Sequence, residues 1–312
     1  MISDLTALRR SLAAAGITPA SVIPPASSGR REEAEIHLAQ LLEGDAVEAR
    51  DVGEAVGWPD PVAFLDGVQH SEVVGYAGSS PIVVASVAAA VRERNARVLA
   101  TRVVRRRDLV IGRRAALDAA GPALAGLERI ELPDSDPPHP IRELSLAGAA
   151  LDDARGALEV AAGVAYRKES DGWLVVDGSL AESPVWAQDP RMAGVAKSHS
   201  SLPFDGANLE AYLRLPLGHR SPIYLPASRR LAPVRAWAVR LWPWEGKDLL
   251  HGLIRVEVAP VNGTPGMADR ISRWLLAERA PISAPDPRWD RMLYGIRSVE
   301  EFLKATRVSP HR

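Results

Sequence analysis

The 312-residue sequence contains no cysteine, and this absence removes several kinds of chemistry. Disulfide bonds, thiolate zinc sites and cysteine nucleophiles are excluded, and nothing favours export to an oxidising compartment. The N-terminal residues lack an uninterrupted apolar segment of the kind that a signal peptide needs. The longest apolar run, Pro81 to Val91, is far shorter than the ~20 residues of a membrane-spanning helix. We expect a cytoplasmic protein that does not enter a membrane.

An excess of charge of one sign is missing as well, because the formal net charge is -1. The chain therefore lacks the overall basicity of many nucleic-acid-binding proteins, and any positive surface must be local. Hydrophobic residues make up 46% of the sequence and charged residues 25%, which is typical of a globular protein with a substantial core. The length fits one large α/β domain with insertions or two modest domains.

The first part of the chain is predicted to form an N-terminal helical arm. Capping and apolar spacing predict one helix over residues 3–15 and a second over residues 32–43, joined by a Pro/Ser/Gly linker. We assign residues 1–58 to this arm and residues 59–312 to the main domain. Packing of the arm against the main domain is the simpler interpretation, and docking of a partner protein is the alternative.

Three strand-like runs follow at residues 63–74, 82–91 and 97–104, and the short turns between them imply an antiparallel meander. Residues 105–140 are less regular and begin with three consecutive arginines. Such a cluster is more often a solvated edge than a phosphate contact. Apolar residues at spacings of three, four and seven then predict a helix over residues 140–168.

Two apolar runs end in the same dipeptide, Asp-Gly. One run ends at Asp66-Gly67, and the other, which begins at Trp173, ends at Asp177-Gly178. Each indicates a buried strand that presents a carboxylate, with a glycine that lets the chain turn away. A single run of this kind is more often only a turn. Two of them, on either side of a helix that carries Glu159, leave the structural and functional interpretations evenly matched.

The predicted order of elements favours an α/β fold with an RNase H-like mixed sheet, an antiparallel meander plus parallel strands, flanked by helices. In that topology the fourth strand lies beside the first, so that Asp66 and Asp177 are able to share a metal ion, with Glu159 as a third ligand. Hard oxygen ligands suit Mg²⁺ or Mn²⁺. Two such ions are able to activate water and neutralise the leaving oxygen in phosphodiester cleavage.

The second half of the chain is predicted to contain further strands and two helices. The strands are expected at 209–215, 221–225, 235–241 and 249–259, and the helices at 268–278 and 298–304. Several arginines flank an apolar, aromatic block, and with an aromatic side chain they would form a groove for single-stranded DNA. These residues are Arg214, Arg220, Arg229, Arg230, Tyr212 and Trp186. An ordinary solvated face is the simpler interpretation, and His70 and His199 are more often structural than functional at such positions.

Several segments resemble the NurA nuclease family. They are FLDGVQ, ALEVAA before GWLVVDGSL, AGVAKSHS and RVEVAP, and the resemblance covers roughly residues 60–305. It implies a manganese-dependent nuclease of RNase H-like fold that acts on DNA ends and single-stranded DNA as a homodimer. It also implies docking on a hexameric HerA-type ATPase that translocates DNA in end resection, repair or phage defence. The sequence has no Walker-type phosphate loop, so the energy would come from that partner.

Within this resemblance, Asp66 and Asp177 match the two metal-binding aspartates. Glu159 matches the glutamate on the helix. Lys197 matches the lysine after the second aspartate and is expected to contact phosphate.

The C-terminal part of the chain departs from the family pattern of a tyrosine followed by a histidine. Tyr294 is present, but no histidine follows within residues 296–305. Asp290 is the expected substitute as a metal ligand, with Glu300 and Glu301 as alternatives.

The departure leaves two functions open: an active nuclease, or a catalytically weakened adaptor or DNA-binding subunit of the same ATPase complex. A third interpretation, an actin-like phosphotransfer enzyme, also places Asp-Gly at strand ends. It is disfavoured because paired glycine-rich phosphate loops are missing.

Overall fold

The structure is a computed structural model. It describes residues 5–16, 18–19, 35–96, 98–134, 137–197, 199, 201–227, 232–244, 249–279 and 293–306. Asp290, Arg229 and Arg230 lie outside the described residues.

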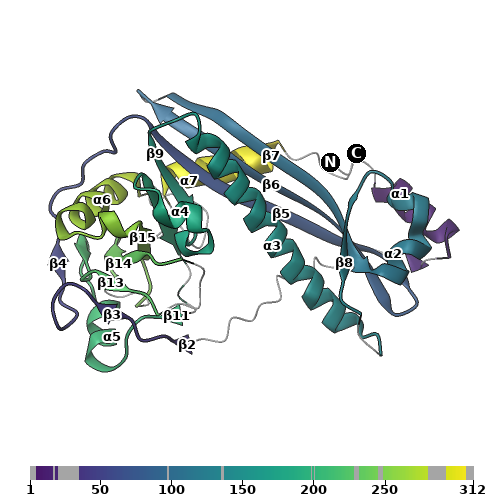
Figure 1. Cartoon of the computed structure of the whole chain (residues 1–312), viewed down its shortest axis with the longest axis horizontal. Coiled ribbons are helices and arrows are strands. Elements are labelled where there is room, and N and C mark those ends of the chain that lie inside the picture. Colours follow the sequence, from purple (N-terminus) through teal and green to yellow (C-terminus); the bar gives the residue numbers. More distant parts are fainter. Residues whose placement is uncertain are drawn as a thin grey trace.

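Three long strands form an antiparallel ribbon, β5 (Val62–Ala77), β6 (Ser80–Asn95) and β7 (Val98–Arg113). The ribbon extends well past the rest of the sheet (Figure 1). Gly78, with φ of 62°, lies in the tight turn between β5 and β6, where a positive φ matches the twist of the hairpin. The predicted meander is confirmed, with strands longer than expected.

The expectation of irregular structure over residues 105–140 is wrong for much of that segment. β7 continues through the three arginines to Arg113, and α2 (Arg114–Ala120) and β8 (Glu128–Leu132) follow it. The arginines fit a strand because their charges are solvated or paired along an edge. Arg107, for example, forms an ion pair with Glu128 of β8.

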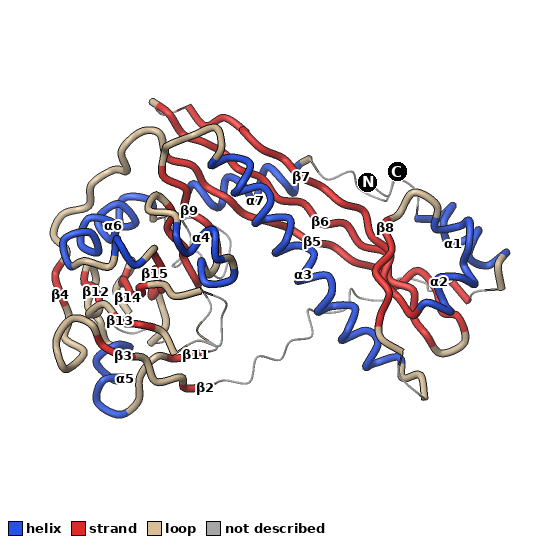
Figure 2. Tube along the Cα trace, viewed as in Figure 1, coloured by secondary structure: helices blue, strands red, loops and turns tan. Residues whose placement is uncertain are grey.

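The helix α3 (Pro140–Arg167) confirms the helix predicted over residues 140–168. Its apolar residues, among them Leu151, Leu158 and Ala162, pack on one face of β5, β6 and β7 (Figure 2). Pro140 opens the helix, and its φ is already helical at the first turn.

The strands β9 (Trp173–Asp177) and β10 (Met192–Ala196) join the sheet in parallel with β5. The order is β7-β6-β5-β9-β10, so the fourth strand lies beside the first. The predicted α/β fold, an RNase H-like mixed sheet flanked by helices, is therefore confirmed. Alternate residues of β5 and β9 face α3 on one side and a second apolar layer on the other.

The sheet continues beyond β10 through antiparallel strands. β15 (Leu253–Val258) pairs with β10, and β14 (Arg235–Arg240) pairs with β15. The helices α6 (Pro265–Glu278) and α7 (Tyr294–Ala305) cover the face opposite α3. The two strands and two helices predicted in these regions are confirmed, with shifted ends.

One predicted strand is a helix. Residues 209–215 were expected to be extended, but α5 (Gly206–Leu213) occupies most of this segment. Leu209, Tyr212 and Leu213 pack together in one apolar cluster. Their spacing of three and four is helical, and a short apolar run does not distinguish the two periods.

The N-terminal segment is helical only in part. α1 (Leu5–Ala14) is confirmed, and Leu12 is buried against the distal end of the ribbon near α2. The second helix, expected over residues 32–43, is wrong for the described residues.

That segment instead contributes short strands to the sheets. They are β2 (Glu35–Ile36), β3 (Gln40–Leu41) and β4 (Arg50–Asp51), which pair with β11 (Ser201–Leu202), β13 (Tyr224–Leu225) and β12 (His219–Arg220). Tertiary contacts override the helix propensity here. Glu43 accepts hydrogen bonds from the buried Arg220, at 2.7 and 3.0 Å, and this contact fixes the chain beside β13. β3 and β4 thus belong to the main sheet, and β2 forms a separate two-stranded sheet with β11. No helix of the described residues is long and apolar enough to cross a bilayer.

Candidate functional site

Two aspartates face each other where β5 and β9 part. The last backbone pair of these parallel strands is Leu65 with Val176, so Asp66 and Asp177 are the next residues on each strand. Both lie on the same face of the sheet as Phe64, because side chains alternate along a strand. Asp66 is 8% exposed and accepts a hydrogen bond of 2.8 Å from the Gly67 N–H.

The edge of β5 is open beside these aspartates. β9 ends at Asp177, and β1 (Thr18–Pro19) joins the same edge of β5 only at Gly75 and Tyr76. Within the described chain, residues 66–74 of β5 have no strand partner on that side. In the described chain, the backbone groups of this stretch that point away from β6 therefore have no ladder partner, and the Gly67 N–H donates to Asp66 Oδ1.

Glu159 approaches from α3, on the other face of β5, over Gly67. A Cβ atom at position 67 would lie only 2.1 Å from Glu159 Oε1. Glycine is therefore required here for space. The predicted turn after Asp66 is wrong, because β5 runs through Gly67 without interruption. The chain does turn at Gly178, where φ is 128°.

Two cations hold two of the three carboxylates. Lys197, just after β10, places its Nζ 2.9 Å from Asp177 Oδ2. Arg155 Nη1 donates to Glu159 Oε1 from one turn earlier in α3. Arg155 Nε also donates to Gln69 Oε1 of β5 at 3.0 Å. The structure thus places Asp66, Glu159, Asp177 and Lys197 in one region of the sheet, where Arg155 and Gln69 also lie.

The electrostatics show an acidic cluster with too little countercharge. Burial raises the pKa of Asp66 well above its ordinary value, and the charges of Asp177 and Glu159 add to this, against the opposing effect of Lys197. Burial likewise raises the pKa of Glu159 to about 7, although Arg155 opposes the shift. Both carboxyl groups are thus destabilised as anions, and a nearby positive charge would stabilise them.

The cluster fits a divalent cation in its chemistry. Three carboxylates offer the hard oxygen ligands that Mg²⁺ and Mn²⁺ take, and burial, the main cause of the raised pKa values of Asp66 and Glu159, disfavours their anionic forms. In the described part of the chain, however, no three His, Asp or Glu side chains converge enough to hold a metal ion. Arg155 and Lys197 instead hold the oxygens of Glu159 and Asp177.

The expected ligand near the C-terminus is not placed by the structure. Asp290 falls outside the described residues. Glu300 and Glu301 form ion pairs with Lys304 and Arg297 along α7. Tyr294 is exposed at the start of that helix. A fourth ligand therefore stays a prediction.

The turn after Asp177 is held by a buried carboxylate that sequence reasoning missed. Glu257 of β15 accepts hydrogen bonds from Ser179 Oγ at 2.5 Å and from the Leu180 N–H at 3.0 Å. Its other oxygen accepts from Arg255 Nε at 3.1 Å. The segment RVEVAP was noticed only through a resemblance. No pattern in it showed that Glu257 reaches the Asp177 turn.

Most of the predicted single-strand groove is not assembled. Arg220 is buried and paired with Glu43 and Asp269. Tyr212 and Trp186, the expected stacking residues, are buried in the core. His199 Nε2 lies 2.9 Å from the backbone oxygen of Leu253, a contact with the second half of the sheet.

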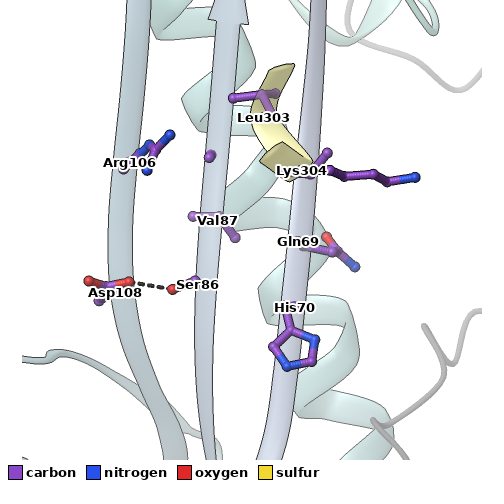
Figure 3. Close-up of a pocket in the computed structure, with 10 residues that line it drawn as sticks. Gln69, His70, Ser86, Val87, Arg106, Asp108, Leu303 and Lys304 are labelled. Carbon is purple, nitrogen blue, oxygen red and sulfur yellow. Dashed lines mark hydrogen bonds between the residues drawn. The ribbon is translucent and has the colours of Figure 1, made fainter. Parts of the chain in front are cut away.

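His70 belongs to a separate cavity. A cavity of about 150 Å³ lies further along the ribbon, where α7 ends (Figure 3). It is lined by Val68, Gln69, His70, Ser86, Val87, Ala88, Arg106, Asp108, Leu303 and Lys304. Its polar groups are engaged within the chain. Ser86 Oγ donates to Asp108, and Arg106 Nη1 donates to the Thr306 backbone oxygen at 2.9 Å.

Comparison with known proteins gives one structural similarity. No family model matches the chain, and no curated protein matches it. Among solved structures, the fold is similar to the crystal structure of the NurA nuclease from Sulfolobus solfataricus, with a TM-score of 0.47 and 10% identity. The similarity covers 82% of this chain and 86% of that chain. Similarity at this level carries no conclusion about activity.

Proposed function

We propose that the chain is a divalent-metal-dependent deoxyribonuclease that hydrolyses phosphodiester bonds at DNA ends and in single-stranded DNA. The observation that carries the proposal is the facing pair Asp66 and Asp177, with Glu159 brought over Gly67. A structural role alone does not explain why burial and like charges meet at one strand edge, because such an arrangement destabilises the fold.

Each residue has a role in this proposal. Asp66 and Asp177 would hold Mn²⁺ or Mg²⁺, and Glu159 would be the third carboxylate. The ion, when bound, would supply Lewis-acid stabilisation of the phosphate and an activated water. Lys197 would neutralise a phosphate oxygen close to Asp177. Glu257 would keep the Asp177 turn in place.

The open edge of β5 supports a strand-shaped substrate. In the described chain, residues 66–74 have no strand partner on this side, immediately beside the carboxylates. A single strand or a frayed end would reach this edge next to the end of β9. The assembly partners, a second copy of the chain and a HerA-type ATPase, rest on the resemblance of the sequence motifs.

The test is cleavage of a fluorescently labelled single-stranded oligodeoxynucleotide in Mn²⁺. The wild-type chain should cleave, and Asp66→Asn and Asp177→Asn should lose nearly all activity. Asp153→Asn is the matched control because Asp153 is exposed on α3. Equal cleavage by Asp153→Asn and the two site variants would refute the assignment.

A second candidate is a DNA-binding adaptor for the same ATPase. The observation that favours it is the lack of three converged ligands among the described residues, together with the missing histidine in residues 296–305. Calorimetry with Mn²⁺ separates the two functions. A chain that binds the ATPase and DNA but no Mn²⁺ would be the adaptor.

A further inference from the structure

We propose that Arg155 is a phosphate-binding residue that is held on Glu159 in the metal-free protein and released when a divalent cation binds. This inference rests on the proposed function and deepens it. It concerns a residue that the sequence motifs did not indicate.

The charges at the site are paired one to one, with one carboxylate left over. Three carboxylates meet two cations, and each cation holds one carboxylate: Lys197 on Asp177, and Arg155 on Glu159. A divalent ion that binds these carboxylates must compete with the cations for the same oxygens. The cations are then left beside a site whose substrate is an anion.

Arg155 is also held by a side chain other than Glu159. Its Nε donates to Gln69 Oε1 at 3.0 Å, and Gln69 Nε2 donates to Asp152 Oδ1 at 2.8 Å. This second anchor does not involve Glu159, so Arg155 stays at the edge of β5 when Glu159 turns to a metal ion. Gln69 is therefore a positioning residue. It lies on β5 two residues after Gly67, on the same face.

Arg155 has N–H donors that are not used within the described chain, and its side chain is partly exposed to solvent. A guanidinium has five N–H donors, and Arg155 uses Nε and Nη1 in the bonds above. Within the described residues, Nη2 has no acceptor in the chain. The side chain is 33% exposed. Its planar donors suit two oxygens of one phosphate.

Arg155 and Lys197 lie on different sides of the aspartate pair. Lys197 lies beyond the end of β9, whereas Arg155 lies on α3 behind the open edge of β5. Two cations on opposite sides of the Asp66–Asp177 pair would contact successive phosphates of one strand.

The experiment compares Arg155→Met with Arg142→Met. Arg142 is exposed in the first turn of α3, about 20 Å from Arg155 along the helix axis, so its loss changes net charge equally. Mn²⁺ affinity is measured by calorimetry. DNA binding is measured by anisotropy with a phosphorothioate single strand over a range of salt concentrations.

Arg155→Met should bind Mn²⁺ about fivefold more tightly than wild type, since a competing cation is gone. Its salt slope for DNA binding should fall by about 0.7–1, the loss of one phosphate contact. Arg142→Met should change neither quantity. If Arg155→Met fails to fold, Arg155→Gln removes the charge and carries the same two expectations.

Equal Mn²⁺ affinity and salt slope in Arg155→Met and Arg142→Met would overturn the inference. So would weaker Mn²⁺ binding by Arg155→Met, which would make Arg155 a support for a ligand. A wild-type chain that neither binds Mn²⁺ nor cleaves would instead overturn the proposed function, and the salt slope would still decide whether Arg155 contacts phosphate.

Discussion

Asp66 and Asp177 stand opposite each other on adjacent parallel strands, one residue beyond the last backbone pair of β5 and β9. This relationship explains how two aspartates that are far apart in the sequence come to lie close together, so that the charge of each acts on the other. The strands separate at this point, so the carboxylates lie at an open edge and not inside a continuous sheet. Three features around the pair, and one buried arginine away from it, lead to testable predictions.

Gly67→Ala should disable the site while leaving the sheet in place. The new Cβ would meet Glu159 Oε1 at 2.1 Å, and the carboxylate would have to move away. We expect a stability loss of about 1–3 kcal/mol and a loss of most Mn²⁺ affinity, measured by urea unfolding and calorimetry.

The matched control for this change is Gly156→Ala, one turn from Glu159 in α3. Nothing lies within 4 Å of a Cβ there, so alanine should stabilise the helix by about 0.5–1 kcal/mol. If Gly67→Ala kept the Mn²⁺ affinity of the wild type, metal binding would not depend on the position of the Glu159 carboxylate over residue 67.

The metal-free protein should lose stability through Glu159 as pH rises. The folded pKa of Glu159 is about 7, above its ordinary 4.5, so between these values the folded chain binds more protons than the unfolded chain. Stability from this group is present below pH 4.5 and is lost as pH rises through 7.

Melting temperatures of the wild type and Glu159→Gln in chelator, from pH 5 to pH 8, measure this effect. The advantage of the glutamine variant should grow with pH. Parallel curves for the two proteins would contradict the raised pKa.

Glu257 should control activity through the Asp177 turn. Glu257→Ala would leave Arg255 without its carboxylate and the Ser179 turn without its acceptor. The expected destabilisation is about 3–5 kcal/mol. The milder Glu257→Gln should lower kcat with little change in KM for DNA, because it disturbs Asp177 and leaves the open edge intact.

Glu301→Gln is the control for this substitution, since the Glu301 side chain is 63% exposed on α7. If both glutamine variants kept wild-type kcat, the Asp177 turn would not depend on Glu257.

Arg220→Met should destabilise the fold and leave DNA affinity unchanged. Arg220 is 1% exposed and holds Glu43 and Asp269. Loss of one partner in such a network costs about 3–5 kcal/mol. Arg214→Met, at a side chain 57% exposed, should stay within about 0.5 kcal/mol of wild type. If Arg220→Met folded but bound DNA more weakly than wild type, the result would contradict this prediction and support the single-strand groove expected from the sequence.

The sequence predicted the central topology because its signals are local. Apolar runs with short turns predicted β5, β6 and β7, and 3.6-residue spacing predicted α3. The parallel placement of β9 followed from the order of these elements. The helix expected over residues 32–43 was predicted wrongly because the conformation there is set by the contact of Glu43 with the buried Arg220, which lies far away in the chain.

The acidic residues of the candidate site could be predicted from the sequence, whereas the residues that hold them in place could not. The two Asp-Gly pairs drew attention to Asp66 and Asp177, but they do different things. Gly67 makes room for Glu159, and Gly178 turns the chain. Arg155 and Glu257 were missed because their roles depend on contacts across the sheet. The i,i+4 spacing of Arg155 and Glu159 was the available signal.

The most direct test of the central claim is anomalous diffraction at the manganese edge from crystals grown with Mn²⁺. The account predicts a peak in direct coordination contact with carboxylate oxygens of both Asp66 and Asp177, with Lys197 and Arg155 moved off their carboxylates. A manganese peak elsewhere, or none near the Asp66–Asp177 pair at saturating Mn²⁺, would contradict it.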